Sequence, residues 1–187
     1  LQSGALLNPE VLLIGQENKS FLEHQMMKKL SSFETTVGKT GDYVESRTEN
    51  IRVGTERFNR LTVAPGKSVS FNKVALKRTA ANGYQAALEI AYGNYVEGIG
   101  GGICQVSSTL YLASVYAELT ILERVNHGFP VHYIPYGMDA TVNWGFTDLK
   151  MRNDSPLPVK IRAETSDGYV RIDILGTEVR DYDIKMT

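Results

Sequence analysis

The centre of the sequence is the run Gly100-Gly101-Gly102-Ile103-Cys104-Gln105-Val106-Ser107-Ser108-Thr109-Leu110. From Ile103 to Leu119, apolar and small side chains recur at helical spacing with almost no charged residue between them. A helix that is apolar around most of its circumference has to be buried. The run therefore predicts a buried central helix that carries Cys104 in its first turn.

Beyond this helix, short alternating or β-branched segments are divided by Gly, Pro and Asn. An antiparallel sheet needs cover for its apolar face, and the central helix would supply it. We therefore predict an α+β fold, with the cysteine at the N-terminus of a buried helix that packs on a C-terminal antiparallel sheet. The expected strands are Val131–Ile134, Ala140–Trp144, Phe146–Met151, Val159–Ala163 and Tyr169–Leu175.

Upstream of the glycines, helical spacing, capping residues and turn residues alternate. They predict, in order, a helical or connecting segment up to about Leu30, a strand over Ser32–Val37, a helix capped by Ser46 and Glu49, a hairpin turning at Pro65-Gly66, and a helix over Gly83–Tyr95.

Composition excludes several classes of protein. Hydrophobic residues make up 42% of the 187 residues, charged residues 22%, and the formal net charge is -1, without the basic stripe that nucleic acid requires. We therefore expect one main globular unit and no nucleic-acid partner. No apolar stretch is long enough to span a bilayer. A single cysteine cannot form an internal disulfide.

The setting of Cys104 favours nucleophilic chemistry. Gly100, Gly101 and Gly102 leave room for a substrate backbone, and the positive end of a helix favours a thiolate. The N–H groups of the first turn would stabilise an oxyanion. We assign substrate contacts to these glycines, to Gln105 and to Tyr133, and expect no cofactor. The alternative is a free cysteine that only packs in the core.

A nucleophilic cysteine needs an imidazole and a group that orients it. His24 lies in the peripheral N-terminal segment, whereas His127 and His132 follow the central helix. Helix-borne cysteine followed by strand-borne histidine is loosely papain-like or transglutaminase-like, by analogy. A hairpin between the first two expected strands would bring Asp148 nearer His127 and Asp139 nearer His132. Each of these residues also has a purely structural interpretation.

Two other uses of the thiol compete with this one. Cys104, His127, His132 and an aspartate would complete a zinc shell, but their spacing is not that of a preorganised site, and we assign no metal. Disulfide exchange lacks a resolving cysteine.

The sequence resembles the VanW family through a set of spaced motifs. They are Arg47-x-x-Asn50-Ile51, Pro65-Gly66-x-x-x-Ser70-Phe71-Asn72, Gly100 to Tyr111, Glu123-Arg124, His127 with Pro130-Val131-x-Tyr133-x-Pro135, Gly137-x-Asp139-Ala140-Thr141-Val142, Asp148 and Asn153. The resemblance covers about residues 31 to 176.

This resemblance implies an extracytoplasmic protein of Gram-positive type bacteria, at the cell surface or wall, with its signal or anchor outside this sequence. The family pattern includes positions that match Cys104, His127, Asp139 and Asp148 but not His132, which favours His127 as the base. Glu118 stands where the family commonly has glycine. We expect an N-terminal extension or end of a preceding domain over 1–30, a VanW-like domain over 31–177 and a C-terminal tail over 178–187.

The leading hypothesis is a cysteine hydrolase or transpeptidase of the cell envelope that acts on peptidoglycan peptides or surface proteins. The alternative is a non-catalytic wall-binding or scaffolding module associated with glycopeptide resistance.

Overall fold

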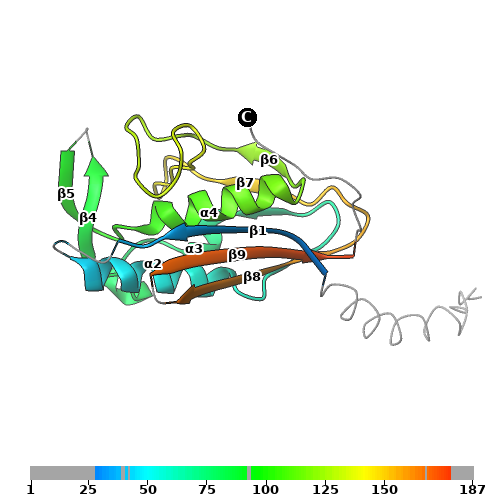
Figure 1. Ribbon diagram of the computed structural model, residues 1–187, viewed down its shortest axis with the longest axis horizontal. Helices are drawn as coiled ribbons and strands as arrows, with labels where there is room; N and C mark the ends of the chain where they lie inside the picture. Colours follow the sequence, from blue (N-terminus) through cyan, green and yellow to red (C-terminus); the bar gives the residue numbers. More distant parts are fainter. Residues whose placement is uncertain (1–27, 39–40, 42, 92–93, 167, 178–187) are drawn as a thin grey trace, which may run out of the picture.

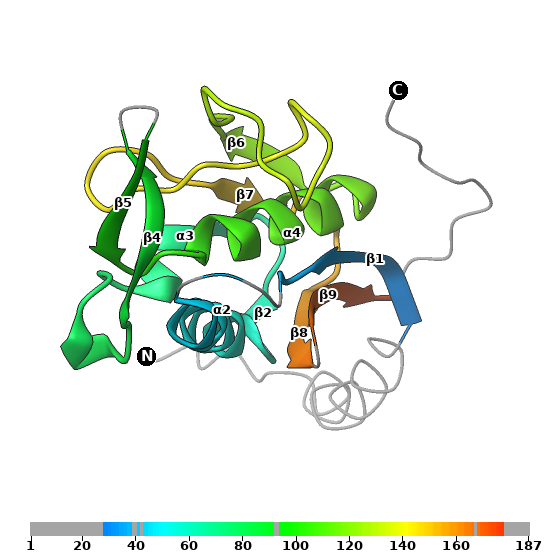
Figure 2. The same ribbon diagram turned by 60° about the vertical axis from the view of Figure 1, so that its left-hand side comes forward.

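The computed structural model describes residues 28–38, 41, 43–91, 94–166 and 168–177. Within them, three antiparallel sheets surround one helix, α4 (Ile103–Tyr116). Figures 1 and 2 show this helix between a large sheet on one side and long loops on the other. The expected α+β class and the buried central helix are confirmed, whereas the papain-like comparison is not.

Helix α4 is enclosed on nearly every side, so its polar residues need partners inside the protein. Its apolar residues Val106, Leu110 and Ala113 are fully buried. The hydroxyl of Thr109 lies 2.8 Å from that of Thr35, and Ser31 donates to the carbonyl oxygen of Ala113 over 2.6 Å. These contacts fix the helix against the neighbouring strand.

The large sheet has the strand order β1-β9-β8-β2. Its strands are β1 (Lys28–Thr36), β9 (Tyr169–Gly176), β8 (Val159–Ser166) and β2 (Thr62–Val63). Ile161, Ile172 and Ile174 are fully buried on the face that α4 and α2 (Val44–Phe58) cover. Strand β1 pairs with β9 along its whole length, and this pairing brings the two ends of the described chain together.

Two smaller sheets complete the fold. Strand β7 (Lys150–Arg152) lies between β3 (Ser68–Ser70) and β6 (Thr120–Glu123). Strands β4 (Ala86–Ala91) and β5 (Asn94–Ile99) form a hairpin that stands at the end of the molecule where α4 begins (Figure 1). Helix α3 (Phe71–Ala75) and the 3-10 turn η1 (Ala80–Asn82) connect β3 to this hairpin.

The predicted helix over Gly83–Tyr95 is wrong, because the hairpin β4–β5 occupies this segment. The residues before the hairpin are held from outside: the side chain of Asn50 binds the backbone N–H and carbonyl of Gln85 and the carbonyl of Gly101. Tertiary contacts thus decide the structure of a segment whose apolar residues fit both the helical and the strand period.

Two further local predictions are wrong. Strands β2 and β3 flank Pro65-Gly66 but pair with β8 and β7 in different sheets, so no hairpin forms there. Helix α2 begins before Ser46, whose hydroxyl donates to the Tyr43 carbonyl, while Glu49 binds Arg52 instead of closing a capping box.

The segments Val131–Ile134 and Ala140–Trp144 were expected as strands and are loops apart from an isolated bridge between Asn143 and Thr147. The backbone of Ala140 is bound by Ser107 and Ser108 of α4 rather than by a partner strand, and this is visible only in the assembled fold. The expected helical or connecting segment up to Leu30 lies mostly outside the described residues.

Candidate functional site

Cys104 lies in the first turn of α4, where Gly102 adopts the left-handed backbone conformation before the helix. The thiol is partly exposed, and its Sγ lies 3.6 Å from the carbonyl oxygen of Val142. It faces a cleft of about 1140 Å³ between the hairpin, the start of α4 and the loops that follow β6. The cleft makes the only cysteine of the chain accessible to a ligand.

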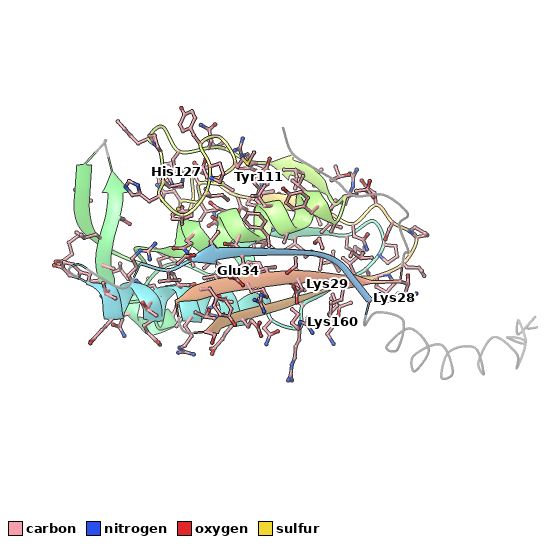
Figure 3. The ribbon with its side chains drawn as sticks, viewed as in Figure 1. Lys28, Lys29, Glu34, Tyr111, His127 and Lys160 are labelled. Atoms are coloured by element: carbon pink, nitrogen blue, oxygen red, sulfur yellow. The ribbon has the colours of Figure 1, made fainter. Side chains whose placement is uncertain are left out.

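His127 and Asp139 lie beside this thiol on the long loop after β6, and Figure 3 shows His127 above α4. Asp139 is almost fully buried, and its Oδ2 accepts from the backbone N–H of His127 over 2.7 Å and contacts the ring Nδ1. The carboxylate therefore fixes both the backbone and the ring of His127.

The pKa of His127 reports on the same neighbours. Burial acts to lower it, but a hydrogen bond with the Cys104 side chain, the charge of that side chain and the contact with Asp139 outweigh burial. The result is a pKa raised above the ordinary value of 6.5. Cys104 and His127 thus line the same cleft, and Asp139 holds the imidazole.

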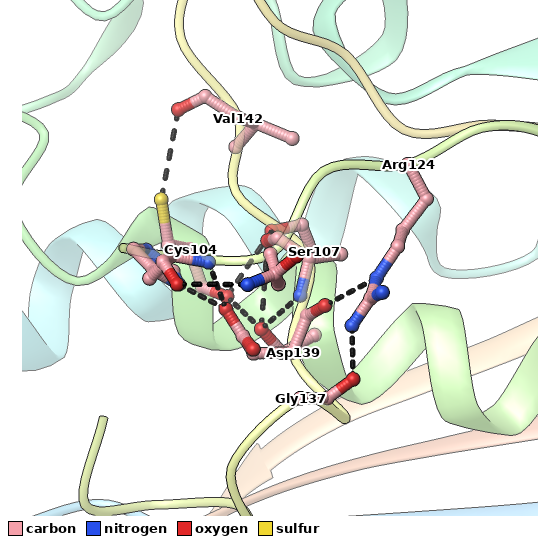
Figure 4. A network of polar contacts seen from close by, with 10 residues as sticks. Cys104, Ser107, Arg124, Gly137, Asp139 and Val142 are labelled. Atoms are coloured by element: carbon pink, nitrogen blue, oxygen red, sulfur yellow. Dashed lines mark hydrogen bonds and ion pairs between the residues drawn. The ribbon is translucent and has the colours of Figure 1, made fainter. Parts of the chain in front are cut away.

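The segment from Asp139 to Val142 is held on α4 by hydroxyl groups. Ser107 donates to the carbonyl of Ala140 over 2.6 Å, and the N–H of Ala140 donates to Ser108 over 3.0 Å. On its other side, Arg124 donates to the carbonyls of Asp139 and Gly137 (Figure 4). The helix that carries the thiol therefore also positions the carboxylate and the carbonyl next to the thiol.

Asp148, by contrast, does not contact His127. Its carboxylate accepts from the hydroxyl of Ser70 and from the N–H groups of Asn72 and Leu149, which ties the start of α3 to β7. The expected nearness of Asp148 to His127 is wrong, because the hairpin that implied it does not form. His132 is exposed along the same cleft, and Asp139 contacts His127 instead.

The glycines and Gln105 border the cleft but also have packing functions. A Cβ at Gly101 would lie 2.4 Å from the carbonyl oxygen of Leu88, and one at Gly100 would lie 2.5 Å from Cγ of Arg78. Gln105 is buried and binds Arg47, Thr35 and the carbonyl of Thr36. Close packing of the loop accounts for these residues without a ligand.

Tyr133 lines the cleft next to the thiol. Burial is the main cause that raises the pKa of its phenol, and the charge of Cys104 acts in the same direction, while a hydrogen bond with Ser108 opposes them. The phenol therefore stays protonated at neutral pH.

Arg78 is the cleft residue that the sequence analysis missed. It lines the cleft near Cys104, at the end where α3 leads into η1. An isolated Lys77-Arg78 pair carries no local signal of this position. A pattern of basic residues that converge on one cysteine appears only after folding.

Among the described residues, no group of three or more His, Cys, Asp or Glu side chains is placed to hold a metal ion. Within the same part of the chain, none of the helices is both long and apolar enough to cross a bilayer.

Comparison with known proteins gives a consistent result. The family model described as VanW like protein matches residues 46–175. The uncharacterized protein YoaR of Bacillus subtilis is 36% identical over 171 residues, which are 91% of this chain and 55% of that protein. The vancomycin B-type resistance protein VanW of Enterococcus faecalis is 31% identical over 124 residues, which are 64% of this chain and 45% of that protein.

This chain therefore spans about half the length of both relatives. No solved structure matches it.

Proposed function

The chain belongs to the VanW family, and from this premise we propose that it is a cysteine acyl-transfer enzyme of the cell envelope. Cys104 is the nucleophile, His127 the general base and acid, and Asp139 the group that orients the imidazole. The observation that carries the proposal is that Cys104 and His127 line one cleft while Asp139 holds the imidazole from its other side.

The expected protonation states of His127 and Cys104 suit this chemistry. Asp139 contacts Nδ1 of His127, so Nε2 is the nitrogen that exchanges a proton with Sγ. The raised pKa of His127 favours an imidazolium next to a thiolate. A thiolate is the nucleophilic form of cysteine.

In the first half-reaction, the thiolate attacks the carbonyl carbon of an amide. The S–C bond forms, the C–N bond breaks, and the imidazolium gives its proton to the leaving amine. A thioester remains on Cys104. In the second half-reaction, water or another amine attacks the thioester and gives a proton to His127, which releases a carboxylic acid or a new amide and restores the thiolate.

The start of α4 would stabilise the intermediate of both steps. First-turn N–H groups have no acceptor inside their own helix, and the helix dipole adds positive potential at the same end. The N–H of Cys104 belongs to this turn. Donors placed at a developing oxyanion typically contribute roughly 3–4 kcal/mol to lowering the barrier.

The cellular setting rests on the family. One relative is named a vancomycin B-type resistance protein, and this supports a substrate in the cell envelope, among peptidoglycan peptides or surface proteins, and an extracytoplasmic location. We further propose the division into an extension over 1–30, a VanW-like domain over 31–177 and a tail over 178–187.

The first experiment tests whether Cys104 forms a thioester. Purified protein is incubated with peptides released from Gram-positive cell walls, quenched in acid and analysed by intact-mass spectrometry. We expect an acyl adduct on Cys104 that hydroxylamine removes. It should be absent in Cys104→Ala and much reduced in His127→Gln and Asp139→Asn.

His132→Gln is the matched control, because this imidazole lies at the same cleft and is exposed. A His132 variant that loses the adduct while His127→Gln retains it would contradict the assignment of the base. A folded protein whose Cys104 reacts neither with these peptides nor with iodoacetamide would remove the basis for an enzyme.

A second candidate function is a non-catalytic wall-binding module, and one observation favours it. The loops after β6 expose large aromatic side chains, with Phe129 at 55%, Tyr136 at 68% and Phe146 at 87%. Such rings stack on sugars or peptides. Wall binding that is unchanged in Cys104→Ala but lost in a Tyr136→Ala, Phe146→Ala double variant would favour this function.

A further inference from the structure

The side chain of Arg78 is a cation at the wall of the cleft. Its Nη1 donates to the carbonyl of Leu76 over 2.9 Å, whereas its Nη2 is buried and has no hydrogen-bond partner in the described part of the chain. No carboxylate among the described residues forms an ion pair with it.

The position of this guanidinium is fixed by packing. Its aliphatic stem lies against Gly100, where any side chain would collide with Cβ and Cγ of Arg78. Its charged end lies over the ring of Phe71, 5.6 Å from the ring centroid. The arginine is therefore held in place although its Nη2 is unused.

Removing a cation from water without a partner costs free energy. Burial lowers the pKa of Arg78, and the charges of Tyr84, Cys104 and Asp148 act in the opposite direction.

The rest of the cleft is biased in the same direction. Arg47 and Lys77 line it together with Arg78, against one acidic side chain among the described lining residues, Glu89. Thr141 also lines it, and its buried hydroxyl has no partner among the described residues. The lining of the cavity next to the nucleophile is therefore mainly cationic.

We infer that Arg78 binds a carboxylate of the substrate, so that the acyl-transfer site acts on peptides that carry a free carboxylate near the reacting amide. This inference rests on the proposed function and specifies its substrate class. A planar guanidinium is the side chain best suited to a carboxylate, and Arg78 lines the cleft without an ion pair to any described carboxylate. The carboxylate is either the C-terminus of the peptide or an acidic side chain, and both present the same two oxygens.

Binding is measured apart from catalysis, by calorimetry on the Cys104→Ser variant. Three probes distinguish the sources of the carboxylate: acetyl-Ala-Ala with a free C-terminus, acetyl-Ala-Ala-amide with no carboxylate, and acetyl-Ala-Glu-amide with a side-chain carboxylate. We expect at least one acidic probe to bind about tenfold or more tightly than the neutral amide, as for a charge-assisted hydrogen bond.

The same titrations on Arg78→Gln should reduce the affinity for the acidic probe to that for the neutral one, and Arg78→Lys should give an intermediate value because it keeps the charge and loses the fork. Lys73→Gln is the control, since Lys73 is an exposed cation on the nearby α3 outside the cleft. Circular dichroism identifies any variant that fails to fold.

Equal binding of acidic and neutral probes, no binding of either acidic probe, or an unchanged affinity in folded Arg78→Gln and Arg78→Lys would overturn the inference. These results leave the thioester experiment on the wild-type protein unaffected. Conversely, carboxylate binding that depends on Arg78 in a protein that forms no thioester would reject the enzyme and keep the binding site.

Discussion

Glu118 adopts a backbone conformation that favours glycine, with φ of 59°. It is the residue after the C-cap of α4: its N–H donates to Val115, and the N–H of Leu119 donates to Ser114. These two bonds define the Schellman motif, whose left-handed position is most often glycine. The sequence already marked this position as one where the family commonly has glycine, and the structure gives the reason.

Glu118→Gly should therefore stabilise the protein by about 0.5–1 kcal/mol. Urea unfolding measures the change, with Glu118→Ala as the control, because alanine removes the same carboxylate and keeps the conformational cost. A glycine variant no more stable than the alanine variant would show that the conformation costs little here.

The raised pKa of His127 makes a prediction about pH. A histidine that binds its proton more tightly when folded stabilises the protein below its ordinary pKa of 6.5, and this stabilisation is lost as pH rises through the raised value. The free energy of unfolding should thus fall with pH above 6.5 in the wild type, and His127→Gln should lack this component.

Cys104 and Asp139 both act to raise the pKa of His127, so NMR titration of the ring in variants separates their effects. Cys104→Ser should lower the pKa of His127, because burial then has less to oppose it. His132→Gln should leave the titration unchanged. A ring that titrates identically in Cys104→Ser would refute the contact between thiol and imidazole.

For single residues, the sequence indicated Cys104, His127 and Asp139 as candidates, but it left Asp148 as an alternative for the group that orients His127. The pairing depends on the path of the long loop after β6, which local periodicity does not specify. Arg78 was missed for a related reason, since its distance from Cys104 along the chain is bridged by the hairpin β4–β5.

On the scale of elements, α4 combines the nucleophile and the support of its partners. Ser107 and Ser108 hold the segment that carries Asp139 and Val142, so the polar residues of a buried helix have a positional function. The buried hydroxyl groups form their hydrogen bonds with the loop backbone, and the loop backbone in turn obtains the partners that a neighbouring strand would otherwise supply.

Ser108→Ala should destabilise the protein by about 1–3 kcal/mol, because the buried N–H of Ala140 loses its acceptor. It should also slow the alkylation of Cys104 by iodoacetamide, because the released loop no longer holds Asp139 and His127 in place and the thiol then loses its proposed base. Ser46→Ala is the control: its hydroxyl is bound only to an exposed carbonyl, and a change within about 0.5 kcal/mol is expected. Equal effects of the two substitutions would contradict this function of Ser108.

Elements with one dominant period were predictable: α4, β8 and β9 form where the pattern indicated them. The hairpin β4–β5 was mistaken for a helix because Ala86, Ala87 and Leu88 fit either period. In the sequence, the segments around Val131 and Ala140 resemble strands, because β-branched residues also suit a loop whose side chains enter the core.

For the whole molecule, the decisive contact joins β1 to β9, in which Thr36 pairs with Tyr169 and Lys28 with Gly176. No local signal in the sequence predicts a pairing of such separation, and the expected sheet was confined to the C-terminal third. Strand β1 therefore links two parts of the core. It pairs with β9, and its residues Ser31 and Thr35 bind α4.

A chain shortened to begin at Val37 should therefore fail to fold, whereas one that begins at Lys28 should keep the native spectrum. Heteronuclear NMR and thermal unfolding distinguish the two. A native spectrum from the shorter chain would show that β1 is dispensable and that the domain begins later than proposed.

The antiparallel pairing of β1 with β9 also has a mechanical consequence. Lys28 and Gly176 are partners at the same end of the sheet, so tension applied through the two ends of the domain opens this strand pair one hydrogen bond at a time. Strands loaded in this way peel apart, whereas strands pulled in opposite directions along their length resist together. A domain of this topology, carried by a longer protein under load, would yield early and separate β1 from the helix that holds Cys104.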